Sequence, residues 1–264
     1  MTYQVYAIRY GHLDRRSDQN FLGGDDHARQ MPLDYYVWAI KGESHTVVVD
    51  TGFDADAAAA RGRTLIRPVA TGLAAIGVDV REVLDVVITH LHYDHAGNVN
   101  LFPRARFHVQ DAEMAYCTGR AMTHPHLSAP FSAEDVVAMV RRVYDQRVIF
   151  HAGDAELYPG ISLHHLPGHT LGLQAVRVAT SRGPVVLASD ATHFWANLEL
   201  DIPYPIVADV PAYLESLRNL RALAPSLDHI IPGHDPAVLA RFPPVPGVAD
   251  VVRLDLPPQP RASS

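Results

Sequence analysis

The sequence predicts a single α/β domain that spans residues 1–264. Segments with strand-like and helix-like patterns alternate along the chain, and no stretch rich in proline and serine divides it into two parts. Hydrophobic residues make up 48% of the chain and charged residues 19%, which is typical of a soluble protein with a sizeable core.

In the first half, apolar segments of strand length recur at residues 35–40, 46–50, 83–89 and 106–110. The first two are joined by a turn at 41–44 and are expected to pair. An alanine-rich helix is expected over about 56–76, with a kink at Pro68. The segment 83–89 is almost continuously apolar, as in a buried strand, and Asp111 is a candidate N-cap for a later helix.

The second half returns to strands, at residues 161–166, 173–178, 184–189 and 229–231. Helices are expected over 133–144 and 210–223. The apolar residues of the second helix are expected to share one face, namely Val210, Leu214, Leu217, Leu220 and Leu223. Residues 117–130 are expected to form a loop, and the proline-rich end of the chain is expected to be loose from about residue 257.

The composition argues against several classes of function. The net charge of −7 is unlike that of a general nucleic-acid-binding protein, and it gives no support to adhesion on an anionic membrane. No apolar run is long enough to cross a membrane, and the N-terminus lacks the pattern of a signal peptide. Cys117 is the only cysteine and nothing around it would activate a thiol, so a structural role and a cytoplasmic location are expected.

The chain contains 16 histidines, and several of them have the spacing of metal ligands. His90, His92, Asp94 and His95 follow directly after the apolar segment 83–89. Imidazole and carboxylate groups together suit zinc and its first-row neighbours. In an extended conformation the first three would share a face, and a turn after Asp94 would direct His95 toward a second ion.

Three later segments share one design, in which a strand ends, a tight turn follows and the turn presents a metal-ligating side chain. These side chains are His169, Asp190 and His234. Each segment alone is a weak signal, but their order after the first four ligands makes the combined pattern strong. The sequence therefore predicts a two-metal centre.

This pattern resembles the metallo-β-lactamase fold superfamily, whose members carry HxHxDH, then a lone histidine, a lone aspartate and a final histidine. The match runs from Asp50-Thr51-Gly52 to His234. The resemblance implies a four-layer αβ/βα sandwich with the metals at one edge, between the two sheets. It also implies that one ion is held by His90, His92 and His169, the other by Asp94, His95 and His234, with Asp190 bridging both.

Within this superfamily the chain looks most like the N-acyl-homoserine lactonase group, which opens small lactone rings. It lacks the late cysteine ligand of the best-known β-lactamases, the acidic residue that flavodiiron proteins have where His92 stands, and the basic surfaces of the nucleic-acid-processing members. One departure concerns the substrate. Lactonases usually have a tyrosine three residues after the bridging aspartate, and this chain has His193 there.

The resemblance implies that a metal-bound hydroxide attacks an ester carbonyl. Asp94 is expected to hold the nucleophile and to pass its proton to the leaving oxygen, and His193 to hold the substrate carbonyl or the product carboxylate. Asp50 is expected to orient a ligand imidazole, with a turn-forming role as the alternative. An apolar substrate pocket is expected from residues near the N-terminus and residues that follow His193, namely Phe21, Leu22, Phe194 and Trp195.

The expected cofactors are two divalent ions per chain, with zinc favoured and iron, manganese or cobalt as alternatives. The expected partner is a small lactone or ester, and a homodimer stays open. One competing function is a thioesterase of the glyoxalase II kind, which would need a basic pocket; the sequence shows no Lys/Arg cluster and a single lysine, Lys41. The other is a non-catalytic metal-binding module. Closed structural zinc sites use four ligands for one ion, whereas the pattern here predicts seven ligands for two ions, which argues against such a module.

Overall fold

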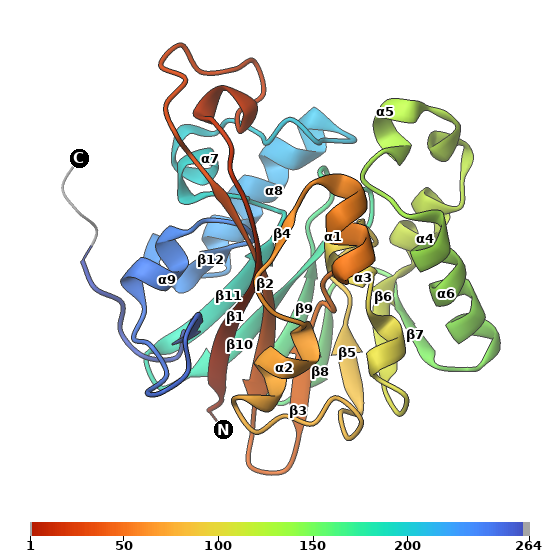
Figure 1. Ribbon diagram of the computed structural model, residues 1–264, viewed down its shortest axis with the longest axis vertical. Helices are drawn as coiled ribbons and strands as arrows, with labels where there is room; N and C mark the ends of the chain where they lie inside the picture. The colour runs from red at the N-terminus through yellow and green to blue at the C-terminus, as the bar shows by residue number, and fades with distance from the viewer. Residues whose placement is uncertain (1, 261–264) are drawn as a thin grey trace.

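The computed structural model describes residues 2–260 and has four layers, with two β-sheets packed face to face and helices on their outer sides (Figure 1). The larger sheet has eight strands in the order β13-β1-β2-β3-β5-β6-β7, with β4 paired to β1 off this path. The smaller sheet has five strands in the order β12-β11-β10-β9-β8. The α/β class and the four-layer αβ/βα sandwich are therefore confirmed.

The strands of the larger sheet are β1 (Gln4–Leu13), β2 (Leu33–Lys41), β3 (Thr46–Val49), β4 (Thr64–Leu65), β5 (Asp85–Val87), β6 (Arg106–Gln110), β7 (Val148–His151) and β13 (Val251–Arg253). Those of the smaller sheet are β8 (Ala155–Tyr158), β9 (Ile161–His165), β10 (Gln174–Thr180), β11 (Gly183–Ser189) and β12 (Ile230–Pro232). Strands β3, β5, β6 and β7 run parallel, and helical segments connect them, as is usual for parallel strands.

The α-helices are α1 (Ala55–Arg61), α2 (Val69–Ala74), α3 (Tyr93–Ala96), α4 (Asp111–Cys117), α5 (Pro125–Ser128), α6 (Ala133–Tyr144), α7 (Trp195–Leu200), α8 (Val210–Ala222) and α9 (Ala237–Arg241). Short 3₁₀ turns lie at Ser17–Gln19, Val99–Leu101, Arg120–Thr123 and Leu227–His229. Among the helices of residues 2–260, none combines the length and the apolar character that crossing a membrane requires.

Strand β2 shows why the layers pack as they do. Its side chains alternate between two cores: Tyr35 and Val37 face the helices α1, α2, α4 and α6, whereas Trp38 and Ile40 face the smaller sheet. Because β2 is covered on both faces, nearly all of its residues are buried. A third apolar cluster lies between the smaller sheet and α8, around Tyr213.

The prediction of one long helix over 56–76 is wrong. The chain forms two short helices there, with β4 between them. Gly62 ends α1 in the left-handed conformation, at φ 64°, which glycine adopts without steric cost. Pro68 immediately precedes the first residue of α2 and marks its start, where its missing N–H costs no hydrogen bond.

Other boundaries also differ from the sequence prediction. The segment 117–130 contains a 3₁₀ turn and α5 rather than a plain loop, and the N-cap of α4 is Gln110. In α8, Leu214 is 36% exposed because Tyr213 takes the core-facing position. Gln259, in the tail, donates a backbone hydrogen bond to Arg241. Residues 261–264, the end of the segment that is expected to be loose, lie outside the described residues.

The fold brings several strand ends to one edge of the sandwich. The HxHxDH segment follows β5 of the larger sheet, whereas His169 lies between β9 and β10, Asp190 follows β11 and His234 follows β12 of the smaller sheet. The candidate site therefore lies where loops from both sheets meet.

Candidate metal centre

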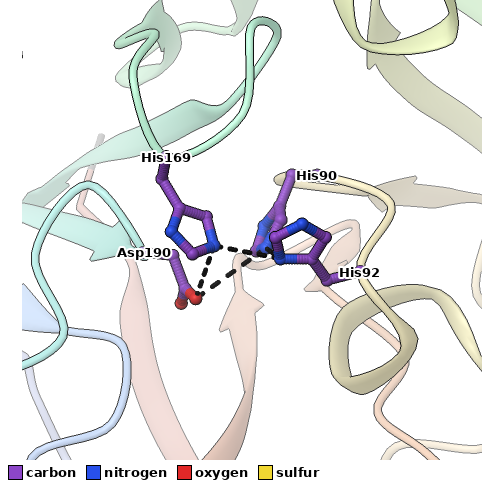
Figure 2. Close-up of side chains that lie close together, drawn as sticks. All are labelled: His90, His92, His169 and Asp190. Carbon is purple, nitrogen blue, oxygen red and sulfur yellow. Dashed lines mark hydrogen bonds and ion pairs between the residues drawn. The ribbon is translucent and has the colours of Figure 1, made fainter. Parts of the chain in front are cut away.

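Four of the predicted ligands form one compact group, in which side chains from the two sheets point toward one another (Figure 2). Nδ1 of His92 lies 3.0 Å from Nε2 of His90 and 3.0 Å from Nε2 of His169. Oδ2 of Asp190 lies 3.1 Å from Nε2 of His169. Three imidazole nitrogens and one carboxylate oxygen thus surround a common point.

A second group contains Asp94, His95 and His234. Nε2 of His95 and Nε2 of His234 lie 3.6 and 3.8 Å from Oδ2 of Asp94. The extended conformation expected for Asp94 is wrong, because helix α3 begins at Tyr93. This helical turn directs Asp94 and His95 toward the second group, and the His95 ring stays beside that of His90, with the centroids 4.1 Å apart.

Asp190 joins the two groups. Its Oδ2 faces the first group, whereas its Oδ1 lies 3.0 Å from Nε2 of His234 and 3.4 Å from Nε2 of His95 in the second. A carboxylate with one oxygen toward each of two ligand sets has the geometry of a bridge between two ions. The structure therefore brings the seven predicted metal residues together in two neighbouring groups, with Asp190 between them.

The chemistry of these donor atoms fits divalent cations. Nε2 of His95 and Oδ1 of Asp190 are buried and make no hydrogen bond, an arrangement that a cation between them would satisfy. Burial and the charges of neighbouring histidines lower the pKa of His90 and His92 well below the usual value, so both rings are neutral and have a lone pair to donate. Burial opposes ionisation of Asp190, but the surrounding histidines outweigh it and hold the pKa of that carboxyl well below its usual range.

The other ring nitrogen of three ligands is held by a hydrogen bond. Nδ1 of His95 lies 2.7 Å from Oδ2 of Asp50, Nδ1 of His169 lies 2.7 Å from the carbonyl of Ile206, and Nδ1 of His234 lies 2.8 Å from the carbonyl of Asp34. Each contact fixes the ring and leaves Nε2 free to bind a metal. The ligand that Asp50 orients is thus His95.

Glu113, which no motif in the sequence indicated, connects the loops that carry His92 and His169. Its carboxylate is fully buried and accepts hydrogen bonds from the backbone N–H of Leu91, the hydroxyl of Thr170 and the backbone N–H of Gly172, at 2.8, 2.6 and 3.1 Å. A buried acid with three donors holds both loops in register. Its only sequence signal is a second acidic residue, after Asp111, in the short helix α4.

Two glycines in the ligand turns are required by close packing. A Cβ atom on Gly233 would lie 2.7 Å from Oδ1 of Asp190 and would displace the bridging carboxylate. A Cβ atom on Gly168, which has φ +137°, would lie 2.3 Å from Cα of Tyr213 in α8. The Pro-Gly-His turns therefore bring the backbone closer to the site than any other residue would permit.

His193 lies inside the centre rather than on the surface. It is 2% exposed, and its Nε2 lies 3.0 Å from Oδ2 of Asp190. Its ring stacks on Tyr204, with centroids 3.6 Å apart and planes within 7°. Burial lowers the pKa of His193 to about 3, so the ring is neutral. The hydroxyl of Tyr204 accepts a hydrogen bond from Arg15.

A cavity of about 270 Å³ opens onto both ligand groups. Its wall includes His193, Tyr35, Tyr93 and Tyr204, and three arginines, which are Arg15, Arg61 and Arg63. Arg61 and Arg63 are two residues apart in the sequence, and the fold brings Arg15 from a distant segment to join them. His126, whose sequence context is unlike that of a ligand, also lines the wall.

The apolar residues expected to bind substrate do not line this cavity. Phe194 packs in the core beneath the larger sheet, and Trp195 packs between the sheets, with its Nε1 donating to the carbonyl of Ile230 at 2.9 Å. Phe21 lines a different cavity, and the nearby Leu22 is 41% exposed. Aromatic residues next to Asp190 in sequence are therefore core residues here, because α7 turns them inward.

Cys117 is buried at the end of α4. Burial and the nearby charge of Glu113 raise the pKa of its thiol to about 12, so the thiolate is scarce at neutral pH. This agrees with the structural role expected from the sequence.

A comparison with protein-family models matches the metallo-beta-lactamase superfamily over residues 31–234. The chain belongs to the metallo-β-lactamase superfamily. Among curated members, an N-acyl homoserine lactonase of Bacillus cereus is 26% identical over 250 residues, which cover 88% of this chain and 93% of the relative. Another, from a Bacillus species, is 30% identical over 165 residues, and the alignment covers 62% of this chain and 60% of that relative. A third, N-acyl homoserine lactonase AttM of Azorhizobium caulinodans, is 31% identical over 67% of each chain.

Solved structures of the superfamily share the fold. A quorum-quenching N-acyl homoserine lactone lactonase superposes with a TM-score of 0.74 and 24% identity, over 90% of this chain and 94% of that one. An N-acyl homoserine lactone hydrolase with N-hexanoyl-L-homoserine bound at its catalytic metal centre also has a TM-score of 0.74, with 23% identity over 91% and 96% of the two chains. This chain is a lactonase-like member of the superfamily with two His/Asp groups suited to metal ions.

Proposed function

We propose that the protein is a dinuclear metal-dependent hydrolase that opens lactone rings. The observation that carries the proposal is the position of Asp190, with one carboxylate oxygen toward each ligand group at the base of a solvent-accessible cavity. The names of the relatives support the choice of lactones, and N-acyl homoserine lactones are the first substrates to test.

Two bound divalent ions would acidify a water molecule and polarise the ester carbonyl. The seven histidines and aspartates would hold the ions, and the hydrogen bonds to Asp50, Ile206 and Asp34 keep the ligand rings oriented. The nitrogen and oxygen donor set suits zinc, which we propose as the metal, with iron, manganese and cobalt as alternatives.

Asp94 is the group proposed to move the proton. It is 8% exposed and lines the cavity, so its carboxylate can reach both the ions and the substrate. Ring opening releases an alkoxide, which needs a proton, and a carboxylate that held the proton of the attacking water can deliver it to this oxygen.

His193 and Tyr204 are proposed to position the substrate carbonyl. Both line the cavity. The phenol of Tyr204 carries a hydrogen-bond donor, whereas the neutral imidazole of His193 directs its single N–H at Asp190 and supports the Tyr204 ring by stacking. Tyr204 accepts a hydrogen bond from Arg15, which leaves the phenolic O–H free to donate. Tyr204, stacked on His193, thus provides the hydroxyl that lactonases usually have on a tyrosine at the position of His193.

The test is a pH-indicator assay with metal-loaded protein and a panel of N-acyl homoserine lactones, aromatic lactones, linear esters and thioesters. We expect turnover of lactones, its loss on chelation, and its return when metal is added back. Asp94→Asn should reduce turnover strongly, whereas Asp56→Asn, at an exposed position in α1, should not. Turnover of thioesters alone would favour a thioesterase, and no turnover by fully metallated protein would favour a metal-binding module.

A further inference from the structure

Three arginines on the cavity wall have no acidic partner. Arg15, Arg61 and Arg63 line the cavity above the ligand groups, and within residues 2–260 none of them forms a salt bridge with an aspartate or glutamate. The chain as a whole has a net charge of −7, whereas these three side chains on the cavity wall are positively charged. The carboxylates of the cavity, Asp94 and Asp190, belong to the ligand groups at its base, and guanidinium groups that have no acidic partner of their own favour an anionic ligand.

Arg61 and Arg63 are fixed beside Tyr93. Nε of Arg63 donates to the hydroxyl of Tyr93 at 3.0 Å, and its Nη1 donates to the carbonyl of Arg61 at 2.7 Å. The guanidinium carbon of Arg61 lies 4.0 Å from the centre of the Tyr93 ring. Nη2 of Arg63 makes no hydrogen bond to the described part of the chain, so its two N–H groups are available to a ligand.

Arg15 is fixed beside Tyr204. Its Nη1 donates to the phenolic oxygen and its Nη2 to the carbonyl of Gln19. Its Nε is buried and makes no hydrogen bond. Each arginine is therefore held in place by hydrogen bonds and keeps donors without a partner, which lowers the entropy cost of binding an anion.

We propose that this wall binds a carboxylate carried by the substrate, so that the protein prefers lactones or esters with an anionic side chain. The inference rests on the proposed function and narrows its substrate class. The ions at the base of the cavity would engage the scissile ester, while the arginines engage the carboxylate at the other end of the molecule. Charge-assisted hydrogen bonds to guanidinium groups are among the stronger contacts available to such a ligand.

The test uses a pair of γ-lactams, which have the shape of the lactones but resist hydrolysis. One lactam carries a carboxylate at the end of its side chain, and the other carries a methyl amide in its place. Calorimetric titration of the metal-loaded protein should give a dissociation constant about tenfold lower for the carboxylate, a preference that increasing salt reduces.

Substitutions should identify the source of this preference. Arg15→Met and Arg63→Met should each reduce the ratio of the two dissociation constants, and the double variant should bring it near unity, whereas Arg63→Lys should keep part of it. Arg61 is left intact because it also donates to the carbonyls of Ala129 and Phe131. Arg218→Met is the matched control, since Arg218 lies exposed on α8, and it should keep the full ratio.

The outcomes separate this inference from the proposed function. Equal binding of the two lactams, no binding of either, or a preference that survives the double variant would overturn the inference; the last would place the carboxylate on the ions. Hydrolysis of the matching lactone pair is measured in parallel. If the lactam preference holds but neither lactone is hydrolysed, the anion-binding wall stands and the hydrolytic function fails.

Discussion

The imidazole of His193 lies flat on the phenol ring of Tyr204, with the ring centroids 3.6 Å apart. The same imidazole contacts the bridging carboxylate of Asp190 through Nε2, at 3.0 Å. One side chain thus connects the metal centre to the wall of the substrate cavity. A substitution that removes the contact with Asp190 but keeps the contact with Tyr204 can show which of the two determines the role of His193.

His193→Phe keeps an aromatic ring against Tyr204 but removes the hydrogen-bonding nitrogens. We expect a higher Michaelis constant or a lower turnover number, with two metal ions per chain retained, because the seven ligands are unchanged. Elemental analysis beside steady-state kinetics tests this. Loss of metal from the variant would show instead that His193 supports Asp190 and does not bind substrate.

Glu113→Ala should destabilise the protein and weaken metal binding together. The substitution leaves three buried donors, from Leu91, Thr170 and Gly172, without an acceptor, which should lower the free energy of unfolding by about 3 kcal/mol or more. Urea denaturation and chelator competition measure the two effects. Glu134→Ala, at an exposed position in α6, is the control and should change neither.

Asp50→Asn should weaken the second ion selectively. Asp50 has φ 63°, a conformation that asparagine tolerates, so the backbone should be preserved. The amide loses the negative charge that holds Nδ1 of His95, and loss of such a contact typically costs about 10- to 100-fold in metal affinity. A metal titration should show one ion released at lower chelator concentration than the other. Simultaneous weakening of both ions would contradict this assignment.

The carboxyl group of Asp85 should make the free energy of unfolding depend on pH in the acidic range. Burial raises the pKa of its carboxyl, but hydrogen bonds from His108 and Tyr158 and the charge of Arg106 outweigh burial and lower the pKa to about 2. A depressed pKa contributes stability above the unfolded value of about 4, and this contribution is lost as the pH falls from about 4 toward 2. The full effect is about 2 kcal/mol.

Asp85→Asn should therefore destabilise the metal-free protein less at pH 3 than at pH 6, by about 1 kcal/mol. Urea denaturation at the two pH values measures this difference. Asp56→Asn serves as the exposed control. An equal loss of stability at both pH values would mean that Asp85 acts through hydrogen bonds alone.

The metal residues could be predicted from the sequence because their signal is local. Each ligand segment follows an apolar strand, which was enough to predict a two-metal centre, and the resemblance to the superfamily supplied the grouping of His169 with His90 and of His234 with Asp94. Helix α6 was predicted with its observed bounds, since Ser132 caps it and its apolar period is regular.

The substrate wall could not be predicted, because it depends on contacts between distant segments. Arg15 and Tyr204 are 189 residues apart, and no pattern near either residue indicates their hydrogen bond. Glu113 is recognised as important only when the loops it joins are seen together. The end of α1, in contrast, had a readable signal in Gly62, which the alanine-rich run concealed.

The position of the ligands between two sheets has a consequence for folding. His90, His92, Asp94 and His95 belong to the larger sheet, and His169, Asp190 and His234 to the smaller one, so each ion would cross-link the two halves of the chain. Bound metal would then resist separation of the two sheets, because the free energy of metal binding adds to the free energy of folding. Amide hydrogen exchange in β5 and β11, compared with and without metal, would report on this closure directly.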